Sequence, residues 1–181
     1  MTVIAGFVED GTVWLGADSA GVSSDYGLTV RSDGKLFRNG QMLFGFTTSF
    51  RMGQLLRHAL TIPDHDPRVA IEKYMATTFM NAVRECLKSN GWASKDKEQE
   101  SGGTFLVAYK GRLFVVHDDY QVGEPVDGIE AVGCGYHIAK GALFASRERG
   151  RERLMVALKA AETYSAGVRG PFFVEALEKG E

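Results

Sequence analysis

Residues 2–19 read Thr-Val-Ile-Ala-Gly-Phe-Val-Glu-Asp-Gly-Thr-Val-Trp-Leu-Gly-Ala-Asp-Ser, and this opening segment sets the architecture of the chain. Residues 2–7 are rich in β-branched and apolar side chains, which is typical of a strand. Residues 9–11 (Glu-Asp-Gly) are a tight-turn signal, and residues 12–18 follow as a returning strand. The segment therefore predicts a β-hairpin that places Asp18 directly across from the start of the chain.

The remaining chain alternates groups of strands with pairs of helices. Asp66 followed by Pro67 predicts the start of a helix, because aspartate caps helices and proline fits the first turn. The polar residues 93–103 predict a solvated loop. Further strands are expected over residues 28–31, 35–37, 42–46, 104–109, 112–117 and 172–177, with a short one ending near Val132, and helices are expected over residues 49–60, 66–88, 136–146 and 151–164.

This order of elements predicts the fold class. Hairpins dominate the strand groups, so the sheets should be mainly antiparallel. Two such sheets flanked by helices bury every apolar face, which gives an α+β, four-layer αββα sandwich. The chain has 181 residues, against roughly 150 for an average domain, so residues 1–181 are predicted to form a single domain.

Composition and charge narrow the classes of function. The chain is 44% hydrophobic and 24% charged, as an ordinary globular protein is. Its 21 basic and 23 acidic residues nearly cancel, which gives no electrostatic reason to expect nucleic acid as a partner. No apolar run approaches the ~20 residues of a membrane span, and the first residues do not resemble a signal peptide. The two cysteines, Cys86 and Cys134, are too few for a disulfide framework, so we expect a cytoplasmic protein.

Thr2 is the first candidate for chemistry. Threonine leaves little bulk after methionine, so we expect an aminopeptidase to remove Met1 and leave Thr2 with a free α-amine. A hydroxyl beside its own amine is a nucleophile with a built-in base, because that amine titrates near ~7.7–8.0. An ammonium group at Lys35 would lower the cost of forming the alkoxide, and a carboxylate at Asp18 would hold that ammonium in place.

Four more segments follow in order along the chain: Asp33-Gly34-Lys35-Leu36-Phe37, Phe44-Gly45-Phe46, Ala131-Val132-Gly133-Cys134-Gly135 and Glu162-Thr163-Tyr164-Ser165-Ala166-Gly167. Together with residues 2–7 and 10–19, this ordered set resembles the proteasome β subunits and the bacterial HslV-type threonine peptidase, which are N-terminal-nucleophile (Ntn) hydrolases. The resemblance spans nearly the whole chain and implies the αββα sandwich of the Ntn hydrolases.

The resemblance implies roles for the residues around the nucleophile. Thr2 would attack the substrate, and its own amine would accept the proton. Lys35 would lower the pKa of the hydroxyl, and Asp18 would orient Lys35. The N–H of Gly45 would stabilise the oxyanion.

A second group of residues is implied to act on the amine. Ser165 and Glu162 would help to hold it through hydrogen bonds. Cys134 occupies a position where the family usually has serine, and a thiol is a weaker hydrogen-bonding group than a hydroxyl. Glu162 replaces the aspartate of the family and is one methylene longer.

The resemblance also implies an activity and partners. The expected function is a cytoplasmic threonine-type endopeptidase that degrades proteins or peptides, as a subunit of a self-compartmentalised, homo-oligomeric ring served by an ATP-dependent unfoldase. The chemistry requires no cofactor, although backbone oxygens of residues 162–168 could bind a structural monovalent cation. Two alternatives stay open: an Ntn amidohydrolase that cleaves small amides, and an inactive ring or scaffold subunit, which the residues at positions 134 and 162 motivate.

Other patterns carry weaker hypotheses. Cys134 begins a helix and could itself be a nucleophile, although no histidine is placed beside it by the sequence. The four histidines and two cysteines lack the spacing of a zinc site. Gly133 and Gly135 are not followed by a third glycine, so a dinucleotide site is not indicated.

Overall fold

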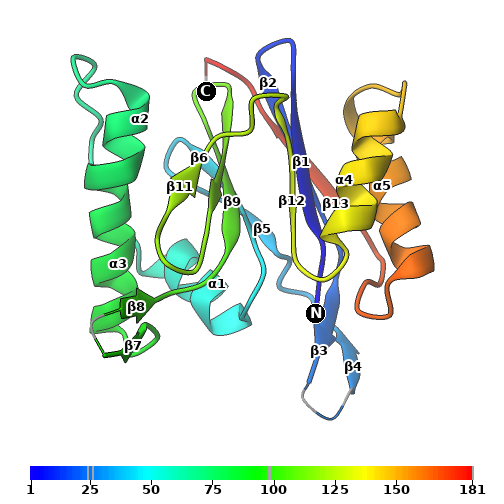
Figure 1. The fold of residues 1–181 in the computed structure, drawn as a ribbon, viewed down its shortest axis with the longest axis horizontal. Helices are drawn as coiled ribbons and strands as arrows, with labels where there is room; N and C mark the ends of the chain where they lie inside the picture. Colours follow the sequence, from blue (N-terminus) through cyan, green and yellow to red (C-terminus); the bar gives the residue numbers. More distant parts are fainter. Residues whose placement is uncertain (24, 26, 98, 181) are drawn as a thin grey trace.

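The computed structural model describes residues 1–23, 25, 27–97 and 99–180, and two stacked antiparallel sheets form its centre (Figure 1). The first sheet has the strand order β12-β1-β2-β13, with β1 at Ile4–Glu9, β2 at Thr12–Ala17, β12 at Ile129–Val132 and β13 at Phe173–Leu177. The second has the order β11-β10-β9-β6-β5, with β5 at Leu36–Asn39, β6 at Met42–Phe46, β9 at Phe105–Tyr109, β10 at Arg112–Val116 and β11 at Val122–Gly123. Two small hairpins lie outside both sheets: β3 (Ala20–Val22) with β4 (Leu28–Val30), and β7 (Ser94–Asp96) with β8 (Gln99–Ser101).

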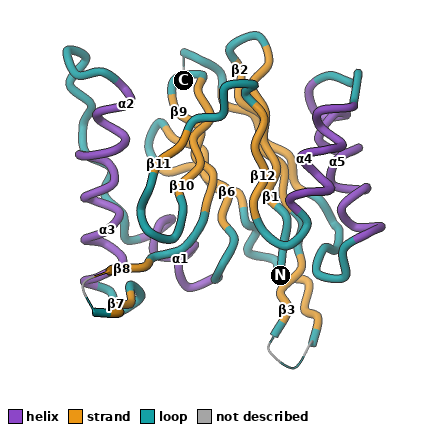
Figure 2. The backbone as a smooth tube through the Cα atoms, viewed as in Figure 1, coloured by secondary structure: helices purple, strands orange, loops and turns teal. Residues whose placement is uncertain are grey.

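Helices cover the outer face of each sheet (Figures 1 and 2). On the second sheet lie α1 (Phe50–His58) and one long helix made of α2 (Ile71–Tyr74), the π-helical turn η1 (Met75–Phe79) and α3 (Met80–Ser89). On the first sheet lie α4 (Tyr136–Ala145) and α5 (Gly150–Tyr164). The predicted α+β, four-layer αββα sandwich is therefore confirmed.

Three apolar layers hold the four structural layers together. Leu15 and Leu43 belong to the layer between the two sheets. Leu158 lies between the first sheet and its helices, and Phe79 lies between the second sheet and its helices. Each sheet thus buries both faces, which explains why its central strands are nearly continuous apolar runs.

The opening hairpin forms as predicted and creates the edge at which the candidate residues meet. In the β1–β2 pair, Ile4 lies opposite Ala17, and the Asp18 N–H donates to the Val3 carbonyl at 3.2 Å. Strands alternate in direction, so the start of β1, the end of β2, the start of β5 and the end of β6 lie at one edge of the sandwich. The N-terminus marks this edge in Figure 1.

Two local predictions were wrong. The long helix begins at Ile71 and not at Asp66, because the Asp66 carboxylate accepts the Arg68 N–H at 3.0 Å and closes a turn of its own. Residues 93–103 were predicted to be a loop, but they contain the β7–β8 hairpin.

Candidate active site

Thr2 is buried at the sandwich edge although it is next to the chain end. Only 3% of it is exposed, while Met1 is half-exposed. Its carbonyl accepts the Gly135 N–H at 3.2 Å. The turn at Gly133 passes so close that an added Cβ would lie 2.4 Å from the Thr2 carbonyl oxygen, and its φ of +93° also favours glycine. The glycines of the Gly-Cys-Gly turn therefore hold Thr2 in place.

The Asp18 carboxylate, fully buried at the end of β2, accepts five hydrogen bonds. Its Oδ1 accepts from the Thr2 hydroxyl, from the Val3 N–H at 3.0 Å and from the Lys35 Nζ at 2.6 Å. Its Oδ2 accepts from the Ala20 N–H at 3.1 Å and the Arg169 N–H at 3.2 Å. Such a set of donors stabilises the charged carboxylate and joins three segments of the chain.

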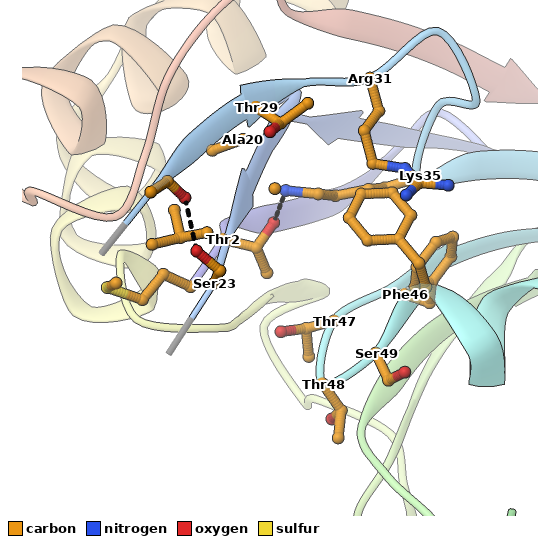
Figure 3. A pocket seen from close by; sticks show the side chains of 15 residues that line it. Thr2, Ala20, Ser23, Thr29, Arg31, Lys35, Phe46, Thr47, Thr48 and Ser49 are labelled. Atoms are coloured by element: carbon orange, nitrogen blue, oxygen red, sulfur yellow. Dashed lines mark hydrogen bonds between the residues drawn. The ribbon is translucent and has the colours of Figure 1, made fainter. Parts of the chain in front are cut away.

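Lys35 enters the site from the residue before β5 and is only 3% exposed. Its Nζ donates to the Thr2 hydroxyl oxygen (Figure 3). The same Nζ also donates to Asp18. Burial lowers the pKa of Lys35 because it disfavours the ammonium, and the charge of Asp18 opposes this shift. The structure thus brings Thr2, Asp18 and Lys35 together, as the sequence predicted.

The other side of Thr2 faces Cys134 and Ser165. The Thr2 N–H donates to the Cys134 Sγ at 3.3 Å, and that Sγ lies 3.6 Å from the Ser165 Oγ. The Thr2 nitrogen is an amide here because Met1 is attached, and it takes the place of the expected free amine. Cys134 therefore contacts this nitrogen directly, and Ser165 reaches it through Cys134.

Glu162 has a different position from the predicted one. Its Oε1 accepts the Gly170 N–H at 2.8 Å, so it fastens the loop after α5 and does not hold the Thr2 nitrogen. The same loop supplies the Arg169 N–H to Asp18. Glu162 thus holds the loop that supplies one of the donors to Asp18.

Gly45 also departs from its predicted role. The Thr47 N–H donates to the Thr104 carbonyl at 3.2 Å, and the register places Gly45 opposite Leu106 in the same pair of strands. Because hydrogen-bonded pairs recur at every second residue, the Gly45 N–H points to β9 and cannot face a substrate. An added Cβ would lie 2.5 Å from the Ile4 Cγ2, so this glycine serves the close approach of the two sheets.

A cavity of about 270 Å³ opens beside Thr2 and Lys35 (Figure 3). Thr47, Thr48 and Ser49 form one of its walls, directly after β6. Thr48 has a φ of +64°, which is rare for a β-branched residue, and among the described residues its N–H has no backbone acceptor. Thr48 was not among the residues predicted from the sequence, although the break in the apolar pattern at residues 47–49 could have indicated it.

Metal ligation is not indicated by the side chains. In the described part of the chain, no three His, Cys, Asp or Glu residues cluster closely enough to hold a metal ion. Within residues 162–168, the Ser165 carbonyl already accepts the Val168 N–H at 3.2 Å. The predicted role of this segment in binding a monovalent cation stays a prediction.

The fold of the chain is similar to the folds of several solved structures. No protein-family model and no curated protein matches the chain. Among solved structures, the chain is similar to BPH from Thiobacillus denitrificans, with a TM-score of 0.76 and 20% identity over 97% of both chains. It is also similar to the eukaryotic HslV from Trypanosoma brucei, with a TM-score of 0.68 and 20% identity over 97% of this chain and 99% of that one.

A third similar structure is Anbu, an ancestral β-subunit, from Yersinia bercovieri, with a TM-score of 0.66 and 15% identity over 97% of this chain and 81% of that one. At these identities the similarity establishes a proteasome-like fold and leaves the activity to be argued from the site. In the described residues, no helix is both long and apolar enough to cross a membrane.

Proposed function

We propose that the chain is a threonine-type endopeptidase once Met1 has been removed. The observation that carries this proposal is the buried contact of the Thr2 hydroxyl with both Lys35 and Asp18, on the wall of a cavity. A cation that donates to a hydroxyl oxygen stabilises the alkoxide that forms during attack. Removal of Met1 adds the free amine that serves as the base.

The steps of the reaction follow from these groups. The Thr2 Oγ1 bonds to the carbonyl carbon of a peptide, and its proton passes to the α-amine. Collapse of the adduct breaks the C–N bond, and the same proton moves to the leaving nitrogen. Water then attacks the ester, with the amine again as base, and the acid product leaves as Oγ1 regains a hydrogen.

The oxyanion needs a donor, and Thr48 replaces Gly45 as our candidate. Thr48 lines the cavity, and its N–H has no backbone acceptor among the described residues. The left-handed conformation of Thr48 costs free energy, and such strain is concentrated at functional sites.

The likeness to other chains supports the same class of reaction. HslV and BPH share the fold, and one structure of the Thiobacillus denitrificans BPH holds epoxomicin. Epoxomicin is therefore a suitable probe, and we expect it to inhibit this chain when Thr2 is the first residue.

The decisive experiment compares three preparations of the protein. The first begins at Thr2, because it is released from a fusion by a protease that cuts directly before this residue. The second retains Met1, and the third carries Thr2→Ala. Intact mass verifies each N-terminus. We expect only the first to hydrolyse fluorogenic peptides. Equal rates in all three would refute the mechanism and favour a scaffold subunit, and turnover of small amides alone would favour an amidohydrolase.

We also propose that the working form is a homo-oligomeric ring in the cytoplasm, served by an ATP-dependent unfoldase. The outer helices support an assembly, because Phe144 on α4 and Tyr164 on α5 are each 78% exposed. Contact with a partner through these helices would remove both rings from water. Sedimentation velocity should give a multiple of the chain mass, and a monomer at micromolar concentration would contradict the proposal.

A further inference from the structure

The cavity beside Thr2 has a one-sided charge. Among its fifteen described lining residues, Arg31 and Lys35 are cationic, and none carries a carboxylate. The partner carboxylates, Asp33 and Asp18, lie outside this lining. The described wall of the cavity therefore presents cationic groups and no carboxylate to a bound group, which suits an anion.

Arg31 is the more exposed of the two cations in the cavity wall. Lys35 is 3% exposed, and its Nζ is occupied by Thr2 and Asp18. The Arg31 side chain is 38% exposed. Its charge can therefore reach a substrate without loss of the Lys35 contacts.

The guanidinium of Arg31 is held in one orientation. Its Nε and Nη2 donate to the two oxygens of Asp33 at 2.7 and 2.6 Å, and its Cζ lies 4.1 Å from the centre of the Phe50 ring. Its Nη1 has no hydrogen-bond partner among the described residues. Because the guanidinium is already held in one orientation and its Nη1 is unused, it loses little conformational entropy when it binds a carboxylate.

The remaining lining suits a short polar side chain. Hydroxyl groups of Thr29 and Thr47 line the cavity, whose volume is about 270 Å³. The neighbouring Asp25 accepts the Ser23 hydroxyl at the rim and does not itself line the cavity. No carboxylate of the described lining thus opposes an incoming anion.

We infer that Arg31 determines specificity, and that the substrates are peptides with an acidic side chain on the acyl side of the cleaved bond. This inference rests on the proposed peptidase function. The acyl part of the substrate is the part that becomes bonded to Thr2 and stays there until water hydrolyses the ester. Because the cavity begins at Thr2, it can hold this part until it is released.

The test uses two fluorogenic peptides that differ only in glutamate or glutamine before the leaving group, so that charge is isolated from size. The Thr2-terminated chain is compared with Arg31→Met, and with Arg68→Met as a matched control. Like Arg31, Arg68 forms a bidentate ion pair with an aspartate two residues away, which is Asp66. This pair lies on an exposed surface. Thermal midpoints verify folding, and Arg31→Gln replaces Arg31→Met if the latter does not fold.

We expect kcat/KM to favour the glutamate peptide by about 10- to 100-fold, which is the range for a hydrogen bond to a charged group. Arg31→Met should bring this ratio close to one, and Arg68→Met should leave it unchanged. The inference is overturned if the parent chain does not prefer the glutamate peptide, or if Arg31→Met keeps that preference. Either result leaves the proposed peptidase function intact.

A binding measurement separates this inference from the proposed function. If the parent chain cleaves neither peptide, the peptidase proposal fails, and the dissociation constants of fluorescein-labelled peptides for the Thr2→Ala chain decide the specificity. A glutamate preference of about tenfold that Arg31→Met removes would sustain the role of Arg31. Equal dissociation constants would refute it.

Discussion

The substitution Asp18→Asn tests whether the buried carboxylate organises the site. Asparagine keeps the shape of the side chain but has one acceptor oxygen in place of two. If its carbonyl keeps the position beside Lys35, its NH₂ group faces the N–H groups of Ala20 and Arg169, and both lose their acceptor. The side chain also loses the charge that balances the Lys35 ammonium.

The size of the effect follows from these losses. Removal of one partner from a buried ion pair costs about 3–5 kcal/mol. A buried donor without an acceptor, such as the Ala20 N–H, costs about 1–3 kcal/mol, and the partly buried Arg169 N–H costs less. Lys35 can release its proton when Asp18 is replaced, and a neutral amine needs no counter-charge. The total loss of stability is therefore smaller than the sum of these costs. We therefore expect the free energy of unfolding to fall by about 4 kcal/mol at pH 7.

The pH dependence adds a second signature. Burial already lowers the pKa of Lys35 from 10.5, and loss of the Asp18 charge lowers it further. Between that lowered pKa and 10.5, the unfolded chain binds more protons than the folded chain, so the stability of the variant rises with pH. The deficit of Asp18→Asn should consequently shrink as the pH is raised from 7 to 10.

Urea denaturation of the parent and the variant at both pH values measures the effect. Asp33→Asn is the control, because Asp33 pairs with Arg31 while one third of its side chain is exposed, and we expect a change below about 1 kcal/mol. If Asp18→Asn destabilises the chain by no more than Asp33→Asn does, and its deficit is independent of pH, the account of the buried cluster is wrong.

Four further outcomes are expected. Gly45→Ala should lower the free energy of unfolding by about 1–3 kcal/mol, because its Cβ would lie 2.5 Å from the Ile4 Cγ2; an unchanged denaturation midpoint would show that the sheets yield. Lys35→Met should lower kcat/KM of the Thr2-terminated chain by about 10²- to 10³-fold in the peptide assay, and retention of the parent rate would remove Lys35 from the mechanism. The falling limb of kcat/KM against pH should lie below 10.5, because burial lowers the pKa of Lys35 and its deprotonation removes the cation from the hydroxyl; constant activity through pH 10.5 would contradict this. Cys134→Ser should retain activity within about tenfold, since a hydroxyl also accepts the Thr2 N–H, and should abolish any inhibition by thiol alkylation; an inactive variant would mean that the thiol itself is needed.

The parts of the site that the sequence predicted are those set by strand order. Thr2 and Asp18 end up together because one hairpin joins them, and the Glu-Asp-Gly turn identified that hairpin. Lys35 joins them because it precedes a strand that begins at the same edge. The order of hairpins and helix pairs was enough to predict the four layers, since each apolar face needs a cover.

The misplaced residues depend on details that periodicity does not contain. The direction of the Gly45 N–H depends on which residues form the hydrogen-bonded pairs with β9, and a shift of one residue reverses it. The contact of Glu162 with Gly170 depends on the path of a loop. The Arg169 N–H reaches Asp18 across 151 positions of the chain, and no local pattern marks a backbone donor.

Asp18 and Lys35 differ in what the fold alone can explain. Asp18 accepts backbone N–H groups from three separate segments, so a structural role is sufficient to account for its burial. The hydrogen bonds described for the Lys35 ammonium go only to Thr2 and Asp18, and Asp18 would keep four donors without it. The backbone donors therefore account for the burial of Asp18 but not for that of Lys35. A charge held against the hydroxyl that we propose as the nucleophile is the chemical use that accounts for the burial of Lys35.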